Sequence, residues 1–207
     1  MERELGVTRH ATAWWMGTAF GAAAALAVVT LAVFGVEERG TVIALRATAR
    51  LSFLLFWPAY TGSALAALFG PAFLPVRRYG RELGLAFASA HLVHVGLIAW
   101  LCWIGKAPAV SVFLVFGFAL LWTYVLALFS IGRLQQSLSR QGWWWLRTVG
   151  MNYIAYAFAL DFLQLPHPFG VRYLAEYGAF SVMSVVGPLL YFTAMALSIG
   201  RTWRAPS

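Results

Sequence analysis

The chain has 207 residues, of which 61% are hydrophobic and 11% are charged. Because soluble domains carry about a quarter charged residues, we expect most of this chain to face lipid, with no room for a soluble catalytic or nucleotide-binding domain. The formal charge of +8 would suggest nucleic acid in a soluble protein. Here most of the basic residues stand in short segments between apolar runs, where they orient a membrane protein. The expected partner is therefore the lipid bilayer and not nucleic acid.

Six apolar runs follow one another along the chain. They cover residues 13–36, 43–69, 83–104, 109–131, 143–165 and 173–199. Each is close to or longer than the roughly 20 residues that cross a bilayer core as a helix. Inside hydrocarbon only a helix satisfies its own backbone groups, so these runs predict helices. The predicted fold is an all-α bundle of six transmembrane helices that forms a single transmembrane domain over residues 1–207.

Polar segments separate the runs, and their basic residues indicate the direction of the chain across the membrane. Ten of the fifteen basic residues fall on the side that carries both termini, and five fall on the other side. The ten are Arg3, Arg9, Arg77, Arg78, Arg81, Arg133, Arg140, Arg147, Arg201 and Arg204, and the five are Arg39, Arg46, Arg50, Lys106 and Arg172. Because basic residues collect on the cytoplasmic side, we expect cytoplasmic termini and a multi-pass protein of a bacterial inner (plasma) membrane.

The second run carries two arginines, Arg46 and Arg50, four residues apart and therefore on one helix face. They either extend to the outer interface or pair with Asp161 and Glu176, which are expected at a similar depth. The alternative is a clamp for an anionic group such as a haem propionate or a lipid phosphate.

The segment after the second run contains Arg77, Arg78 and Arg81. These arginines are first an orientation signal. They also have the chemistry to dock anionic lipid headgroups or the phosphate of a flavin, and the sequence leaves flavin binding open.

Two histidines, His91 and His94, lie in the middle of the third run, about 12 and 16 Å from its cytoplasmic start at the rise of a helix. Ionisable groups at that depth are costly and need partners, and a spacing of three residues puts both rings on one face. They either pack between helices through hydrogen bonds or bind a metal through one nitrogen. Cys102, the single cysteine, permits neither an internal disulfide nor a cysteine-based metal site.

Two segments of the chain resemble a known family. They are RATARLSFLLF at 46–56 and PVRRYGRELGLAFASAHLVHVGL at 75–97. They are similar to helices 2 and 3 of the ferric reductase-like transmembrane domain, for example in the haem-binding membrane subunit of the periplasmic methionine sulfoxide reductase system. In that family a histidine follows the glycine of R-x-L-G-L by ten residues, which here gives Gly84 and His94, and the helix-2 arginine corresponds to Arg50.

The resemblance implies a membrane subunit that binds b-type haem and passes electrons across the bilayer. His94 would be the first axial ligand of the haem iron and His91 the second candidate, while Arg46 and Arg50 would hold the propionates. Because we expect no flavin or NAD(P)H domain in the chain, an electron-donor or acceptor protein, or a quinone, would complete the path. Any enzyme activity would then be that of an oxidoreductase subunit.

The fifth run departs from the family at the haem ligands. Family members place two helix-5 histidines opposite helix 3, whereas residues 142–164 of this chain contain no histidine. Met151 is the remaining candidate in this run for a second axial ligand, because His/Met ligation of haem iron is known. A five-coordinate haem and a histidine from another subunit are the other two options.

The alternative function is a non-redox membrane scaffold or assembly protein that keeps this fold and has lost haem. Asn152, Tyr153 and Tyr156 would then complete a polar network around His91 and His94. A small-molecule transporter is the third option, because six spans with histidines at mid-membrane permit one, although no sequence feature indicates a substrate.

Overall fold

The computed structural model describes the backbone of residues 2–131, 133–163 and 171–204, and the side chains of 10–131, 134, 136–163 and 176–198. The helices are α1 (Glu2–Phe34), α2 (Glu38–Phe69), α3 (Leu74–Arg78), α4 (Gly80–Trp103), α5 (Val110–Ile131), α6 (Arg140–Leu163) and α7 (Val171–Arg204). Two short 3-10 turns are η1 (Pro71–Phe73) and η2 (Arg133–Ser137). No strand occurs in these ranges, so the prediction of an all-α fold is confirmed.

Five of the described helices are long and apolar enough to cross a bilayer. They contain the segments His10–Phe34, Glu38–Phe69, Gly80–Trp103, Val110–Ile131 and Glu176–Ser198. The run predicted at 143–165 is helical as α6 up to Leu163, and its last two residues lie outside the described ones. α6 is not among the five, because its tryptophans and tyrosines, with Arg147 and Asn152, lower its hydropathy. By these five helices the chain is a multi-pass integral membrane protein.

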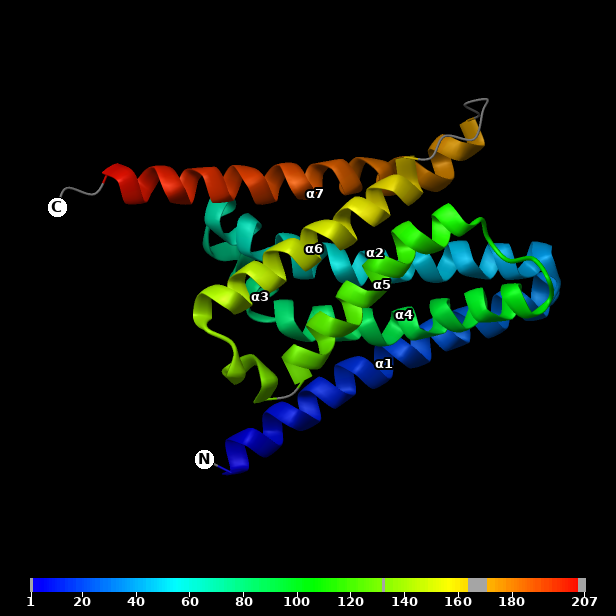
Figure 1. The fold of residues 1–207 in the computed structure, drawn as a ribbon, viewed down its shortest axis with the longest axis horizontal. Helices are drawn as coiled ribbons and strands as arrows, with labels where there is room; N and C mark the ends of the chain where they lie inside the picture. Colours follow the sequence, from blue (N-terminus) through cyan, green and yellow to red (C-terminus); the bar gives the residue numbers. More distant parts are fainter. Residues whose placement is uncertain (1, 132, 164–170, 205–207) are drawn as a thin grey trace.

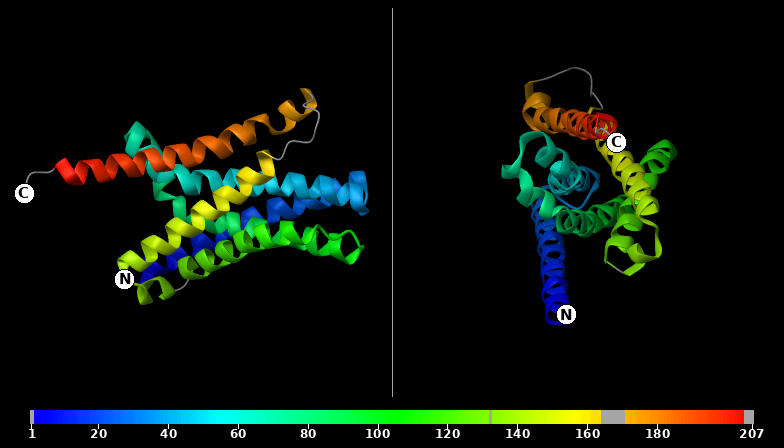
Figure 2. Two further views of the ribbon diagram at one scale, coloured as in Figure 1. Left: turned by 45° about the horizontal axis from the view of Figure 1, so that its top comes forward. Right: turned by 90° about the vertical axis from the view of Figure 1, so that its left-hand side faces the viewer.

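The helices run back and forth along one axis of the molecule (Figure 1). Helices α1, α2 and α4 lie side by side, α7 lies along α2, and α5 and α6 pack on each other while contacting α4 and α7 respectively (Figures 1 and 2). α1 begins and α7 ends at the same end of the bundle, which we call the terminal end. The connections from α2 to α4 and from α5 to α6 lie there too, and with them Arg77, Arg78, Arg81 and Arg140.

Aromatic side chains fill the centre of the bundle between α2, α4 and α6. Phe53, Phe56, Phe87, Phe158 and Phe162 are each at most 8% exposed, and their contacting rings have centroids 4.9 to 6.0 Å apart. Each such ring pair adds about 0.5–1.5 kcal/mol beyond the burial of area. This cluster therefore holds the less apolar helix α6 to α2 and α4.

Helices α1 and α4 meet through alanines. Ala19 and Ala23 of α1 and Ala86 and Ala90 of α4 are all buried in one cluster. Small residues let two helix backbones approach closely and pack well. In a bilayer such packing drives helix association, because an apolar side chain gains little when it exchanges lipid for protein neighbours. The position of α1 against α4 thus follows from side-chain size.

Candidate functional site

The two histidines of the third run lie together on α4. Their rings stack with centroids 5.0 Å apart and an interplanar angle of 16°, as the spacing of three residues predicts. Helix α2 supplies their polar neighbour, because Thr48 Oγ1 lies 3.1 Å from His94 Nδ1. This partner stands 46 residues away in the sequence, and no local pattern indicates it.

The hydrogen bonds around Thr48 define the role of His94. Thr48 is fully buried, and its hydroxyl lies 2.9 Å from the carbonyl oxygen of Ala44 and 3.1 Å from that of Leu45. The Thr48 hydroxyl therefore serves its own helix and the His94 ring together, and the tautomer of His94 sets which of the two side chains donates. The histidine then braces α4 against α2.

His91 has a different environment. Its ring contacts that of Phe87, with centroids 5.5 Å apart. Its Nδ1 is buried and has no hydrogen-bond partner among the described residues. A buried polar atom without a partner costs about 1–3 kcal/mol, so such an atom calls for a function, a ligand or a water molecule.

The space between the histidines and α6 decides whether a haem fits there. Phe87 contacts both His91, on its own helix, and Phe158 of α6, with ring centroids 5.5 and 5.9 Å away respectively. Met151 instead lines a cavity at the terminal end. Where Phe87 meets Phe158, aromatic rings occupy volume that a porphyrin between α4 and α6 would need, whereas nearer the terminal end the same two helices border the cavity that Met151 lines. The described His, Cys, Asp and Glu side chains form no group of three or more that could hold a metal ion.

The polar residues of α6 bond to helices other than α4. The Tyr60 hydroxyl of α2 donates to Asn152 Oδ1 at 2.8 Å, and the Asn152 amide donates to the Thr148 carbonyl oxygen at 2.8 Å. The Tyr153 hydroxyl donates to the Val115 carbonyl oxygen of α5 at 3.2 Å. The network expected around the histidines is therefore replaced by ties from α6 to α2 and α5, because the rotation of α6 presents Phe158 to α4.

Arg50 joins α2 to α7. Its Nη2 lies 3.7 Å from Glu176 Oε2, and its guanidinium carbon lies 4.5 Å from the centroid of the Tyr177 ring. Arg50 Nε is buried without a hydrogen-bond partner among the described residues. Arg46, one turn away, is exposed, and Asp161 of α6 has Arg46 and Arg50 as electrostatic neighbours. The structure thus brings together the arginines and carboxylates that the sequence suggested, while a propionate clamp stays a prediction.

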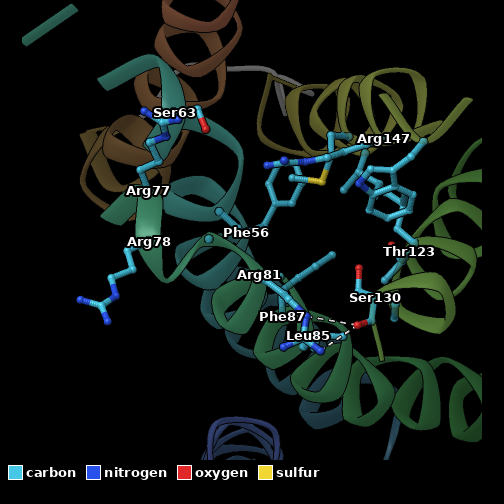
Figure 3. Close-up of a pocket in the computed structure, with 18 residues that line it drawn as sticks. Phe56, Ser63, Arg77, Arg78, Arg81, Leu85, Phe87, Thr123, Ser130 and Arg147 are labelled. Atoms are coloured by element: carbon cyan, nitrogen blue, oxygen red, sulfur yellow. Dashed lines mark hydrogen bonds between the residues drawn. The ribbon is translucent and has the colours of Figure 1, made fainter. Parts of the chain in front are cut away.

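A cavity of about 370 Å³ lies at the terminal end among α2, α3, α4, α5 and α6 (Figure 3). Its walls include Arg77 of α3, Arg81 of α4 and Arg147 of α6, and its apolar side includes Phe56 and Phe87. The sequence indicates Arg77 and Arg81 as a basic loop. It does not indicate the cavity, because Arg147 comes from a helix much later in the chain.

Arg81 is a structural residue of this cavity. Its Nε and Nη2 donate to the Ser130 carbonyl oxygen at 3.1 and 2.8 Å (Figure 3), and its Nη1 lies 3.2 Å from Thr12 Oγ1 and 3.4 Å from Glu82 Oε1. The carbonyl groups in the last turn of a helix lack partners within the helix, and a basic side chain there satisfies them. Arg81 therefore caps α5 and ties it to α4 and α1.

Comparison with known proteins gave no match: no family model, no curated protein and no solved structure matches the chain. The site is therefore interpreted from its own residues. The resemblance of residues 46–56 and 75–97 to the ferric reductase-like domain stays a prediction.

Proposed function

We propose that this chain is a six-span membrane protein on a ferric reductase-like scaffold, with both termini in the cytoplasm. Five apolar helices support the proposal, and α6, with 24 residues, is long enough for a sixth crossing. The arginines at the terminal end support the orientation. The two segments that resemble the family lie on α2 and α4, and these helices pack on each other and bring Thr48 to His94, which supports the proposed scaffold.

We infer that the protein is a non-redox scaffold, an anchoring or assembly subunit that contacts lipid. The observation that carries this inference is the packing of Phe87 against both His91 and Phe158, which puts aromatic rings beside the histidine where a cofactor would lie. In this proposal the bond from His94 to Thr48 and the ion pair of Arg50 act as braces between helices. Polar contacts between membrane helices contribute roughly 0.6–2 kcal/mol each, enough for that purpose.

One observation favours a second function, that of a haem-binding electron-transfer subunit. The buried Nδ1 of His91 has no hydrogen-bond partner among the described residues, and a bound metal or water would provide one. In this proposal His94, His91 and Met151 are the ligand candidates, Arg46 and Arg50 hold propionates, and a separate protein or a quinone supplies electrons. Both proposals place the protein in a bacterial inner membrane.

An absorption spectrum of the detergent-purified full chain, oxidised and then reduced with dithionite, separates the two functions. The scaffold proposal predicts no Soret band in monodisperse protein from haem-replete cells. A Soret band that shifts on reduction, is lost in His94→Ala and persists in the exposed control His10→Ala would overturn it and support electron transfer.

Labelling of single cysteines in intact cells tests the six spans and their direction. In a Cys102→Ala background, cysteines replace Ala107, between α4 and α5, Gln136, between α5 and α6, and Leu163, at the end of α6. A membrane-impermeant maleimide should label positions 107 and 163 directly and position 136 only after permeabilisation. The same accessibility at positions 136 and 163 would show that α6 does not cross the membrane.

A further inference from the structure

The cavity at the terminal end carries positive charge that the described residues do not balance. Arg77, Arg78, Arg81 and Arg147 all belong to its lining, and no described Asp or Glu does. Among the described residues Arg81 alone of the four has an ion pair, with Glu82 at 3.4 Å. Arg77, Arg78 and Arg147 therefore have no acidic neighbour in the lining. These arginines are exposed, and their unbalanced positive charge at the rim and wall of the cavity attracts an anion.

Two of these arginines are placed to meet a ligand. Figure 3 shows Arg147 extending from α6 across the cavity near Phe56, and Arg77 on α3 beside Ser63, whereas Arg78 points away. Neither Arg77 nor Arg147 has a hydrogen-bond or ion-pair partner among the described residues. A guanidinium with its donors available binds phosphate or carboxylate through two parallel hydrogen bonds.

Apolar residues also line the cavity. They include Phe56, Phe87, Leu85 and Ile154, together with Trp143. The volume of about 370 Å³ falls in the range of roughly 300–1,000 Å³ that is usual for small-molecule sites. A free phosphate ion would contact the arginines and leave the apolar lining without a partner. A molecule with a phosphate and an adjoining apolar part would contact both the arginines and the apolar lining.

We propose that this cavity binds the headgroup of an anionic phospholipid, with its phosphate on Arg77 and Arg147 and the start of its acyl chains against Phe56 and Phe87. The inference rests on the proposed orientation, which places the terminal end in the cytoplasmic leaflet. Basic pockets between membrane helices on that side hold anionic headgroups in other proteins. The proposed site would give the scaffold a defined lipid partner.

Native mass spectrometry of the purified full chain in neutral detergent tests the site. The protein is titrated with phosphatidylglycerol, with phosphatidylcholine of the same acyl chains, and with inorganic phosphate. We expect phosphatidylglycerol to bind at least about tenfold more tightly than phosphatidylcholine. The double variant Arg77→Gln/Arg147→Gln should weaken phosphatidylglycerol binding roughly 20- to 30-fold, while Arg39→Gln, an exposed arginine at the other end of α2, should leave it unchanged.

Three outcomes would overturn the proposal. Equal affinity for the two lipids would show that the negative charge is not recognised, and full displacement by inorganic phosphate at equal concentration would show a site for free phosphate. Unchanged binding in the double variant would place the lipid elsewhere. If that variant fails to fold, Ser63→Trp keeps every arginine and narrows the cavity, and it should weaken phosphatidylglycerol binding in the same direction.

The cysteine labelling described above reports orientation independently. A cytoplasmic terminal end without lipid selectivity would overturn the lipid site alone. A selective, arginine-dependent site at an outward-facing terminal end would overturn the orientation and the assignment to the inner leaflet.

Discussion

Replacement of Thr48 by valine tests the brace between α2 and α4. Valine keeps the volume and the branched Cβ of this fully buried residue but removes the hydroxyl that lies 3.1 Å from His94 Nδ1. A buried polar group that loses its partner costs about 1–3 kcal/mol. The backbone carbonyl of Leu45 also lies near the ring, so we expect the lower end of that range, about 1 kcal/mol. For a chain of this size the melting temperature should fall by roughly 2–4 °C.

Thermal unfolding of the detergent-purified protein, followed by tryptophan fluorescence, measures this change. The matched control is Thr123→Val in α5. Thr123 is 4% exposed, and its hydroxyl donates to the Ala119 carbonyl oxygen of its own helix at 2.8 Å. Because no partner on another helix is lost there, the control should shift the melting temperature by less than about 1 °C.

A double-mutant cycle with His94→Leu completes the test. In Thr48→Val/His94→Leu no polar group is left unpaired, so the double variant should be more stable than the sum of the two single effects predicts. Additive effects, or a Thr48→Val protein as stable as Thr123→Val, would refute the brace.

Three further changes test other parts of the molecule. In His91→Leu an apolar side chain replaces a ring whose buried Nδ1 has no hydrogen-bond partner among the described residues, so the melting temperature should stay equal or rise, whereas loss of a metal ligand would lower it. Glu38 lies 2.9 Å from the exposed Lys106 and raises the pKa of Lys106 above its usual 10.5. The small contribution of this ion pair to stability is therefore present below pH 10.5 and is lost as the pH rises through the raised pKa. The difference in melting temperature between wild type and Lys106→Met, followed from about pH 8 to about pH 12, should therefore vanish at the alkaline end. Gly150→Val would place a Cβ 2.9 Å from side chains of α5 and should cost about 1–3 kcal/mol by the same assay, while Gly117→Val, where nothing lies within 4 Å, should cost less.

The helices could be predicted from the sequence because their cause is local. An apolar run such as 109–131 has to satisfy its backbone groups by itself in lipid, and the structure has the helix Val110–Ile131 there. The run 143–165 shows the limit of this reasoning. Its aromatic and polar residues make it the least apolar of the six, and its place in the bundle comes from packing of Phe158 and Phe162 on other helices.

The spacing of His91 and His94 likewise predicted a shared face, and their rings do stack. What those rings meet was beyond the sequence, because it depends on how α2 and α6 are rotated against α4. That rotation brings Thr48 to His94 and Phe158 to Phe87, the ring that contacts His91.

By itself, then, the amino-acid sequence determined an all-helical, multi-pass chain with arginines concentrated at the helix connections, since hydropathy and helix period act over neighbouring residues. Only the tertiary structure decided which of those arginines form hydrogen bonds to other helices and which keep their donors for a ligand. Arg81 donates to the Ser130 carbonyl oxygen at the end of α5, whereas Arg147, from α6, borders the cavity with Arg77. Such assignments depend on contacts between helices far apart in the chain, and their geometry exists only once the bundle has packed.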